Sequence, residues 1–277
     1  MNLQASHIPV ITLLTDFGLE DEYVGVMKGV ILSINPRVDL IDITHNITRH
    51  DIRQAALTVD VSFRYFPKGS PKGSIHVIVV DPGVGGNRKV LCLQQEGHFF
   101  VAPDNGVLTM VVQDGRAEKI CSITNKKYFL KPVSDTFHGR DIFAPAAAHL
   151  SKGIDMLCLG QEIPLSDITR LDVPAPFVSA TNELVGAVIL IDHFGNLVTN
   201  ISEATFERFK DGARSREVVI RLGRSKIQGV SKSYDSVKIG SAVAVFGSRN
   251  LLEISLNQGD ARTYFKARIG QAVRVKL

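Results

Sequence analysis

The sequence contains no tryptophan and only three cysteines, Cys92, Cys121 and Cys158, which lie far apart among its 277 residues. An odd number of widely spaced cysteines suits neither a disulfide framework nor a zinc site, so we expect buried, reduced thiols in a cytoplasmic protein. No apolar run approaches the roughly 20 residues that a transmembrane helix needs. Residues 1–7 lack the basic and then apolar pattern of a signal peptide. We therefore expect neither a secreted, disulfide-stabilised protein nor a membrane protein.

Clustered charge is also lacking. The chain has 32 lysines and arginines against 28 acidic residues, a formal net charge of +4 at pH 7, and the basic residues are dispersed. Nucleic-acid-binding faces concentrate basic residues in a patch or stripe, so we expect no nucleic-acid partner. No GxGxxG follows the first apolar run, which leaves out the dinucleotide-binding fingerprint.

The first half of the sequence alternates strand and helix patterns. Continuous apolar runs that predict buried parallel strands occupy residues 8–15, 38–43 and 75–80. Apolar residues at helical spacing predict helices between them, over 24–34 and 51–63. Such a βαβαβ series is typical of a Rossmann-like, mostly parallel sheet covered by helices.

Further elements are expected after these. A hairpin turning at Glu96 and Gly97, a strand over 118–123 and a helix over 142–150 follow. A short helix at 107–112 is also expected, with Asp104 as its cap.

A change in the sequence pattern divides the chain into two parts. Pro164, Pro174 and Pro176 stand among scattered polar residues, a composition typical of a linker. Short strand patterns dominate beyond it, which predicts a small antiparallel β domain, a barrel or a sandwich, and we expect the barrel. The predicted organisation is an α/β domain over 1–165, a linker over 166–182 and a β-barrel over 183–277.

A glycine-rich loop follows the strand at 75–80. It begins with Asp81, continues through a proline and three glycines, and ends at Arg88. Ligands bind at the C-terminal ends of strands in open α/β sheets, and glycines let the backbone approach a ligand closely. The alternative is an ion pair that only braces the turn, a type of contact that contributes little at a surface.

Two other polar residues are predicted at the same edge of the sheet. Asp16 follows the first strand, where a carboxylate can accept hydrogen bonds from both ribose hydroxyls or can simply cap a turn. His138 begins a predicted helix, where a lone histidine is more often a polar filler than a catalyst. Together with Asp81 and Arg88, His138 could position and polarise a water molecule.

The second domain opens with a polar turn that contains Asp192, Phe194 and Asn196. A ring that stacks and an amide that pairs with a base edge suit an adenine, although a strand-end turn also uses such residues. Ser248 and Arg249 form a similar turn, in which the arginine could bind a carboxylate or be solvated.

Taken together, these segments resemble the S-adenosyl-L-methionine (SAM) hydroxide adenosyltransferase family, which is related to fluorinases and chlorinases. The resemblance covers essentially the whole chain. It rests on TDFGLEDEYVGVMKG (15–29), VVDPGVGGNR (79–88), APDNGVL (102–108), FHGRDIFAPAAAHL (137–150) and IDHFGNLVTNI (191–201).

The resemblance implies that hydroxide displaces methionine from the 5′ carbon of SAM, which yields adenosine and L-methionine. It places the family's catalytic set on Asp81, Arg88 and His138. Halogenating relatives typically have an aromatic residue at the first of these positions, so the set favours water over halide. A halide-dependent adenosyltransferase and a non-catalytic adenosine- or SAM-binding protein remain the alternatives.

The resemblance also implies the binding residues and the assembly. Ribose binding falls on Asp16, and the adenine contacts fall on Phe194, Asn196 and Tyr234. Methionine contacts fall on Asp21, Asp192, Ser248 and Arg249. Tyr23 departs from the family, because relatives have a smaller hydroxyl residue there. No residue type in the catalytic set demands a metal or redox cofactor, so we expect neither. The resemblance implies a homotrimer with the site between subunits.

Overall fold

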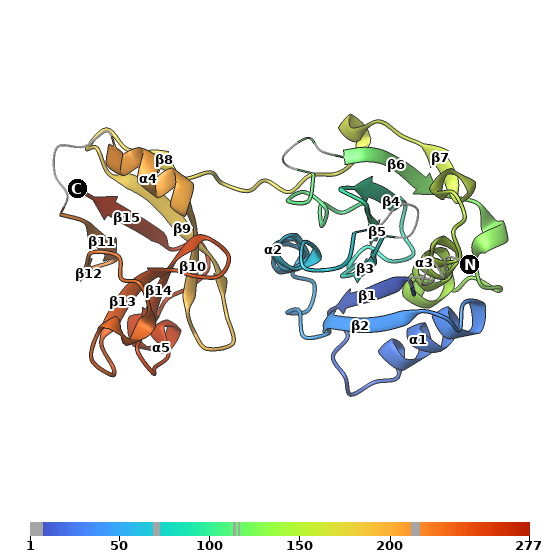
Figure 1. Cartoon of the computed structure of the whole chain (residues 1–277), viewed down its shortest axis with the longest axis horizontal. Coiled ribbons are helices and arrows are strands. Elements are labelled where there is room, and N and C mark those ends of the chain that lie inside the picture. Colours follow the sequence, from blue (N-terminus) through green and yellow to red (C-terminus); the bar gives the residue numbers. More distant parts are fainter. Residues whose placement is uncertain (1–7, 69–72, 113–114, 116, 212–216) are drawn as a thin grey trace, which may run out of the picture. The chain divides into compact units, whose positions relative to one another are not determined.

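The computed structural model describes residues 8–68, 73–112, 115, 117–211 and 217–277. The chain divides into two compact units between Leu171 and Asp172 (Figure 1). This division falls within the range expected for the linker, and the first unit extends six residues past the predicted domain end at 165. Each unit is described by itself below.

A seven-stranded mixed sheet forms the centre of the N-terminal unit. Its strands are β1 (Val10–Thr15), β2 (Asp39–Thr44), β3 (Ile75–Val79), β4 (Val90–Gln95), β5 (His98–Pro103), β6 (Ala117–Ile123) and β7 (Gly160–Glu162), in the order β2-β1-β3-β5-β4-β6-β7. The pairings from β2 through β5 are parallel and the remaining ones are antiparallel. The predicted α/β fold is confirmed, and the β4–β5 hairpin adds the antiparallel half of the sheet.

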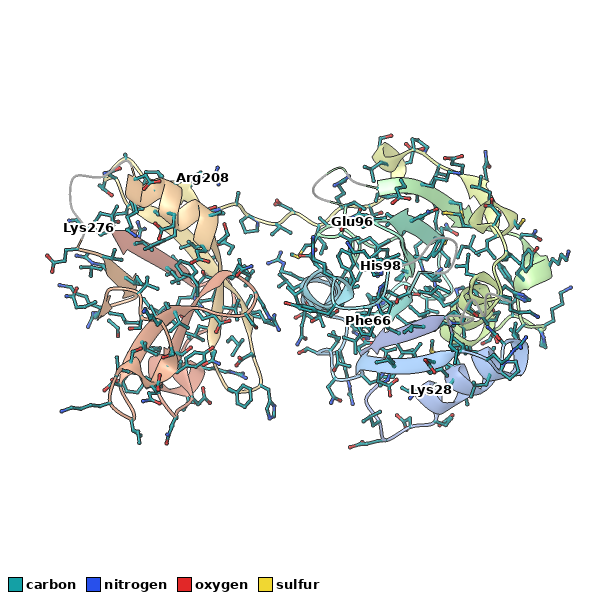
Figure 2. All side chains as sticks on the ribbon, in the orientation of Figure 1. Lys28, Phe66, Glu96, His98, Arg208 and Lys276 are labelled. Atoms are coloured by element: carbon teal, nitrogen blue, oxygen red, sulfur yellow. The ribbon has the colours of Figure 1, made fainter. Side chains whose placement is uncertain are left out.

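Helices cover both faces of this sheet. Side chains alternate between the faces of a strand, so Leu13 of β1 packs with α1 (Tyr23–Ile34) and α3 (Ala144–Ser151), whereas Leu14 packs with α2 (Ile52–Phe63). His98 lies in the interior of this unit and Lys28 lies on α1 (Figure 2). The two apolar layers explain why the strands appear in the sequence as continuous apolar runs.

The strand order creates a switch point between β1 and β3. After β1 the chain passes through α1 to β2 on one side, and β3 pairs with the other side of β1. Ligands of open α/β sheets bind in the crevice at such a point, beyond the carboxyl ends of the strands. Asp16 directly follows β1, and Asp81 lies two residues after the end of β3.

Two local expectations were wrong, and one predicted helix begins earlier than expected. Residues 107–112 form turns rather than a helix, and Asp104 accepts a hydrogen bond from the distant Thr169 N–H (2.7 Å) instead of capping them. The predicted helix over 142–150 begins with a π-helical turn, Gly139–Phe143, before α3. Cys158 is exposed because it ends a short 3-10 turn, whereas Cys92 and Cys121 are buried in the sheet.

The C-terminal unit is a nearly closed antiparallel barrel. Its strands are β8 (Phe177–Val178), β9 (Leu184–Ile191), β10 (Leu197–Ser202), β11 (Val219–Leu222), β12 (Ser225–Gln228), β13 (Ala242–Phe246), β14 (Leu251–Leu256) and β15 (Ala272–Lys276). They are ordered β12-β11-β15-β9-β10-β14-β13, with β8 beside β9. A bridge from Ser231 to Val245 of β13 brings the two ends of this order together, which confirms the predicted barrel.

Two helices accompany the barrel. The helix α4 (Glu203–Asp211) is longer than the single turn that its sequence suggested, and α5 (Ala261–Phe265) was not predicted. Within the described ranges of both units, no helix combines the length and apolar character needed to cross a membrane.

Candidate active site

Arg88 joins the two other members of the predicted catalytic set. Its Nε lies 3.0 Å from both carboxylate oxygens of Asp81, and its Nη2 also donates to Asp81 Oδ2. The same Nη2 lies 2.9 Å from His138 Nδ1. The side chains of Asp81 and Arg88 are only 4% and 11% exposed. The predicted pair and the predicted histidine therefore form one connected, half-buried group.

The contact with Arg88 fixes the state of His138. A guanidinium can only donate hydrogen bonds, so Nδ1 accepts and the ring is neutral with its proton on Nε2. Burial lowers the pKa of His138, and the positive charge of Arg88 lowers it further. Geometry and electrostatics thus agree on a neutral imidazole that offers an N–H donor at Nε2.

Backbone geometry fixes the loop from Asp81 to Arg88. Val84 N–H donates to Asp81 O, and Gly86 N–H donates to Gly83 O. Gly85 has φ +78°, and a Cβ there would lie 2.3 Å from Asp135 O. Only glycine suits this position, because a side chain would be strained and would also collide with the neighbouring backbone.

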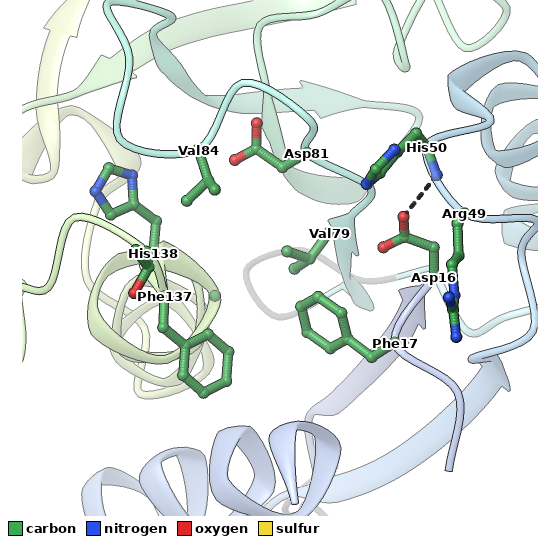
Figure 3. A pocket seen from close by; sticks show the side chains of 11 residues that line it. Asp16, Phe17, Arg49, His50, Val79, Asp81, Val84, Phe137 and His138 are labelled. Atoms are coloured by element: carbon green, nitrogen blue, oxygen red, sulfur yellow. Dashed lines mark hydrogen bonds between the residues drawn. The ribbon is translucent and has the colours of Figure 1, made fainter. Parts of the chain in front are cut away.

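A cavity of about 250 Å³ lies at the switch point (Figure 3). Its walls include Asp16, Phe17, His50, Asp81, Phe137 and His138. Figure 3 shows Asp81 and His138 on one side, Asp16 and His50 on the other, and the two phenylalanine rings below them. The fold thus brings together the predicted ribose ligand and two members of the catalytic set.

Asp16 is held by the backbone of the loop before α2. His50 N–H donates to Asp16 Oδ2 at 2.8 Å, and His50 has φ +65°, a conformation uncommon for a residue with a side chain. Sequence reasoning missed both Arg49 and His50 as cavity walls. The available signal was their position after β2, at the same carboxyl edge of the sheet.

Three aromatic rings form a cluster beside this cavity. The centroid of the Tyr23 ring lies 5.5 Å from that of Phe17 and 5.2 Å from that of Phe137. These rings also line a neighbouring cavity together with Arg140. The ring of Tyr23 thus packs against two rings, Phe17 and Phe137, that line the cavity at the switch point. Asp21 is exposed in the turn before α1 and lines neither of these two cavities.

The barrel carries a separate cavity of about 690 Å³. All six residues predicted in this half of the chain line it: Asp192, Phe194, Asn196, Tyr234, Ser248 and Arg249. They come from the β9–β10 turn, the β13–β14 turn and a 3-10 turn, Tyr234–Ser236. The structure therefore gathers segments that lie more than 50 residues apart in the sequence.

Asp192 orders the turn that presents the aromatic and amide groups. Its Oδ1 accepts the N–H groups of Phe194 (2.9 Å) and Asn196 (2.8 Å), and its Oδ2 accepts Asn196 Nδ2 (2.8 Å). Asn196 Oδ1 accepts no hydrogen bond from the described residues, so this oxygen can accept one from a ligand. Phe194 is 74% exposed, which leaves its ring available for stacking.

Glu253 also lines the barrel cavity, and sequence reasoning missed it. Tyr234 Oη donates to its Oε2 at 2.7 Å. Burial raises the pKa of Glu253, and the negative charge of Asp192 raises it further, whereas the hydrogen bond from Tyr234 lowers it. The pKa of Tyr234 is raised as well, by burial and by its bond to the carboxylate. The signal available in the sequence was an acid within the apolar strand Leu251–Leu256.

Metal-binding geometry is absent from the part of the chain that the structure describes, in which no three His, Cys, Asp or Glu residues form a potential metal site. The N-terminal unit has a charged group at a sheet switch point, and the barrel has an aromatic and amide cavity. Each unit therefore carries a cavity lined by polar and aromatic side chains, the type of site at which proteins bind small molecules.

Comparison with known families identifies the class further. Residues 11–160 match the N-terminal domain of the SAM hydroxide adenosyltransferases, and residues 186–274 match the C-terminal domain of the same family. The chain therefore belongs to the SAM hydroxide adenosyltransferase family.

Individual relatives cover nearly the whole chain. A protein of Thermus thermophilus named (R)-S-adenosyl-L-methionine hydrolase is 32% identical over 274 residues, 95% of this chain and 97% of the relative. A protein of the same name from Methanocaldococcus jannaschii is 35% identical over 260 residues, 90% and 88% of the two chains. A crystal structure of a conserved protein from Thermotoga maritima superposes with a TM-score of 0.87 at 36% identity, covering 96% of this chain and all of that one.

Proposed function

We propose that this protein hydrolyses SAM to adenosine and L-methionine. An oxygen of water forms a bond to the 5′ carbon, the bond from that carbon to sulfur breaks, and the electron pair leaves with sulfur as a neutral thioether. One proton is released from the water. The leaving group needs no general acid, so the site has to supply an aligned and partly desolvated nucleophile. No cofactor or metal enters this proposal.

The connected group of Asp81, Arg88 and His138 carries the proposal. His138 Nδ1 is occupied by Arg88, so we assign proton acceptance to the carboxylate of Asp81. The Nε2–H of His138 orients the water, and the charge of Arg88 favours the hydroxide that forms. Burial of this group keeps the interactions strong, because the surrounding dielectric constant is lower than that of water.

The remaining predicted residues are proposed to hold the substrate. Asp16 binds the ribose hydroxyls, and the rings of Phe194 and Tyr234 contact the adenine. Asn196 accepts a hydrogen bond from the amino group of the base through Oδ1. Methionine contacts are assigned to Asp21, Ser248 and Arg249, and Asp192 contributes by ordering its turn. Among the described residues, Arg249 Nη1 is buried and has no hydrogen-bond partner, which suits binding of a carboxylate.

The sulfur configuration is a specific part of the proposal. Both hydrolase relatives described above carry names that specify the (R) epimer at sulfur. We propose that this chain also prefers (R)-SAM over the (S) epimer. The sulfonium sulfur carries three different substituents, and the two epimers differ in how these substituents are arranged around it. An attack that requires a fixed alignment can therefore discriminate between the epimers.

We further propose a homotrimer in the cytoplasm, with each site formed by the N-terminal domain of one subunit and the C-terminal domain of the next. The family resemblance suggests this assembly, and the cavities of the two units carry complementary parts of the proposed binding set. The free thiols of Cys92, Cys121 and Cys158 suit a reducing compartment.

Halide-dependent adenosyl transfer is the second candidate, because a protein of Nocardia brasiliensis named fluorinase is 26% identical over 296 residues and covers 97% of both chains. In that reaction chloride or fluoride replaces water as the nucleophile and yields a 5′-halogenated adenosine. The connected charged group favours water, since a halide has no proton to release.

Product analysis tests both candidates. The protein is incubated separately with (R)-SAM and (S)-SAM in heavy-oxygen water, with and without chloride or fluoride, and the products are identified by mass spectrometry. We expect adenosine that carries the heavy oxygen, formed faster from the (R) epimer and without need of halide. Halogenated adenosine would support the second candidate. Tight binding of SAM without any product would indicate a non-catalytic binding protein.

A further inference from the structure

Glu253 places a carboxylate in the interior of the barrel wall. The residue belongs to β14 and is 5% exposed. Burial of a carboxylate is costly unless hydrogen bonds or charges compensate it. Here the hydroxyl of Tyr234 donates to Oε2 at 2.7 Å, and the positive charge of Arg249 acts on the same group. The chain thus keeps the Glu253 carboxylate buried at a cost in free energy. The direct hydrogen-bond partner of this carboxylate is Tyr234, an aromatic residue of the cavity.

Gly247 provides the space for this carboxylate. A Cβ at Gly247 would lie 2.0 Å from Glu253 Oε1 and 2.7 Å from Oε2. The glycine has no positive φ, so its backbone conformation does not by itself require glycine. A methyl group added at Gly247 would instead displace the carboxylate of Glu253. This displacement would break the hydrogen bond from Tyr234.

Tyr234 is the partner that reaches the cavity. It is 40% exposed and lines the cavity together with Phe194 and Asn196. A half-exposed ring that can rotate loses conformational freedom when a ligand binds against it, and a ring that is already fixed avoids that loss. The bond to Glu253 fixes the hydroxyl end of the ring, and the residue still lines the cavity.

We propose that Glu253 is a positioning residue, which holds the ring of Tyr234 in the orientation that contacts the adenine base. This inference rests on the proposed function for the identity of the ligand. Glu253 acts through Tyr234 and does not touch the reacting atoms. Its effect is therefore on nucleoside affinity and on KM, with kcat preserved.

Adenosine binding to the full-length protein tests the inference by calorimetry. Glu253→Leu and Tyr234→Phe each remove the hydrogen bond at similar side-chain volume, and Gly247→Ala displaces the carboxylate. We expect each variant to raise the Kd for adenosine by roughly three- to tenfold, the range of one typical lost hydrogen bond. Glu253→Gln keeps an oxygen acceptor and should restore most of the affinity.

The double variant Glu253→Leu/Tyr234→Phe gives the decisive comparison. If Glu253 acts through the tyrosine hydroxyl, the double variant binds no more weakly than Tyr234→Phe alone. Additive losses, or full affinity in Glu253→Leu, would overturn the inference. Tyr264→Phe, at an exposed ring on α5, is the matched control, and thermal melting of each variant identifies losses caused by misfolding.

The same measurements separate this inference from the proposed reaction. If the wild-type protein binds adenosine with the expected coupling but releases no product from SAM, the positioning role stands and the proposed reaction fails. If SAM is hydrolysed with the same KM by wild type and Glu253→Leu, the reaction stands and the positioning role fails. A wild-type protein that binds no adenosine would overturn the inference, because the wall would then have no nucleoside to contact.

Discussion

At the scale of single residues, Arg88 decides what its two neighbours can do. Its guanidinium donates to both Asp81 oxygens and to His138 Nδ1, so the histidine cannot accept a second proton at that nitrogen while the contact lasts. The carboxylate keeps free lone pairs, because each of its oxygens can accept more than one hydrogen bond. We therefore expect the acid to act as the proton acceptor and the imidazole as a donor.

Asp81→Asn should strongly impair catalysis and preserve nucleoside binding. The amide keeps the shape of the side chain but cannot accept the proton, so we expect kcat to fall by about 10²- to 10⁴-fold, the range of a lost general base. Adenosine affinity should stay within about twofold, since the proposed ribose and base ligands are other residues. Steady-state kinetics with (R)-SAM and calorimetry with adenosine measure the two quantities.

Asp135→Asn is the matched control for this variant. Asp135 also acts electrostatically on His138, but its side chain does not line the cavity at the switch point. Its replacement removes a nearby negative charge without touching the connected group, so activity should stay close to that of the wild type. An Asp81→Asn protein that retains wild-type kcat would contradict the assignment.

The position of individual polar residues could be predicted where charged side chains stood next to a recognisable strand end. Asp81 and Arg88 flank a glycine loop at a strand end, and this pattern was enough to place them at the carboxyl edge of the sheet. Spacing alone did not show that Arg88 also contacts His138, because this contact joins segments 50 residues apart in the sequence. Glu253 was missed for the same reason, since its partner Tyr234 lies on another segment.

At the scale of elements, strands β3 and β5 carry two buried histidines between apolar layers. His76 Nδ1 lies 2.7 Å from Thr12 Oγ1, and His76 Nε2 lies 3.2 Å from His98 Nδ1. Burial lowers the pKa of His76 to about 3, with a further contribution from His98. Burial likewise lowers the pKa of His98 to about 4, and Lys68 adds to this shift. Both rings are therefore neutral in the folded protein over the physiological pH range.

These histidines should make the N-terminal unit sensitive to acid. Unfolded histidines bind protons below about pH 6.5, whereas the folded ones stay neutral to about pH 4, so the unfolded state holds more protons in between. The contribution of the two neutral histidines to the free energy of unfolding is thus fully present above about pH 6.5. It falls as the pH decreases, by about 1.4 kcal/mol per pH unit for each histidine. Amide hydrogen exchange of β3 and β5 measures this free energy of opening.

His98→Phe isolates one of the two contributions. The phenylalanine fits beside Phe63 and Phe100, whose rings already pack against His98, although His76 Nε2 loses its partner. We expect lower stability at pH 7.5 and a slope between pH 6 and pH 5 that is shallower by about 1.4 kcal/mol per pH unit. Replacing the exposed His193 by Asn should leave the slope unchanged. An unaltered slope in His98→Phe would refute the buried neutral state.

The elements themselves were predicted well wherever periodicity was strong. Strand β3 and helix α2 agree with their predicted ranges to within one residue, because one continuous apolar run and one helical stripe define them. Residues 107–112 were wrongly predicted as a helix, since their apolar side chains are buried in turns against α2 and the sheet. The π-helical turn Gly139–Phe143 was also missed, because its apolar pattern continues directly into α3.

At the scale of the whole molecule, the proposed binding set is divided between two units. Asp16, Asp81 and His138 line a cavity of the N-terminal unit, whereas Phe194, Asn196 and Tyr234 line a cavity of the barrel. The sequence alone predicted this division, because the linker composition separates two different periodicities. It could not determine which copies of the two units serve one substrate, since that depends on surfaces that no local pattern encodes.

Complementation between two inactive variants tests the proposed assembly. One variant carries Asp81→Asn, and the other carries Phe194→Ala with Asn196→Ala; each has a different affinity tag. Tandem purification after co-expression yields only mixed trimers. In a ring where each site joins the N-terminal unit of one subunit to the C-terminal unit of the next, every mixed trimer contains one intact site out of three. We therefore expect about one third of the wild-type activity.

The controls distinguish this arrangement from its alternatives. Two differently tagged copies of Asp81→Asn should co-purify without activity, because no intact catalytic group exists in any of their trimers. If each site lay within a single subunit, the mixed trimers would also be inactive although both variants are present. Light scattering must give the mass of three chains, because a dimer with shared sites would instead recover about half of the activity. The recovered fraction therefore reports both the number of subunits and the sharing of the site.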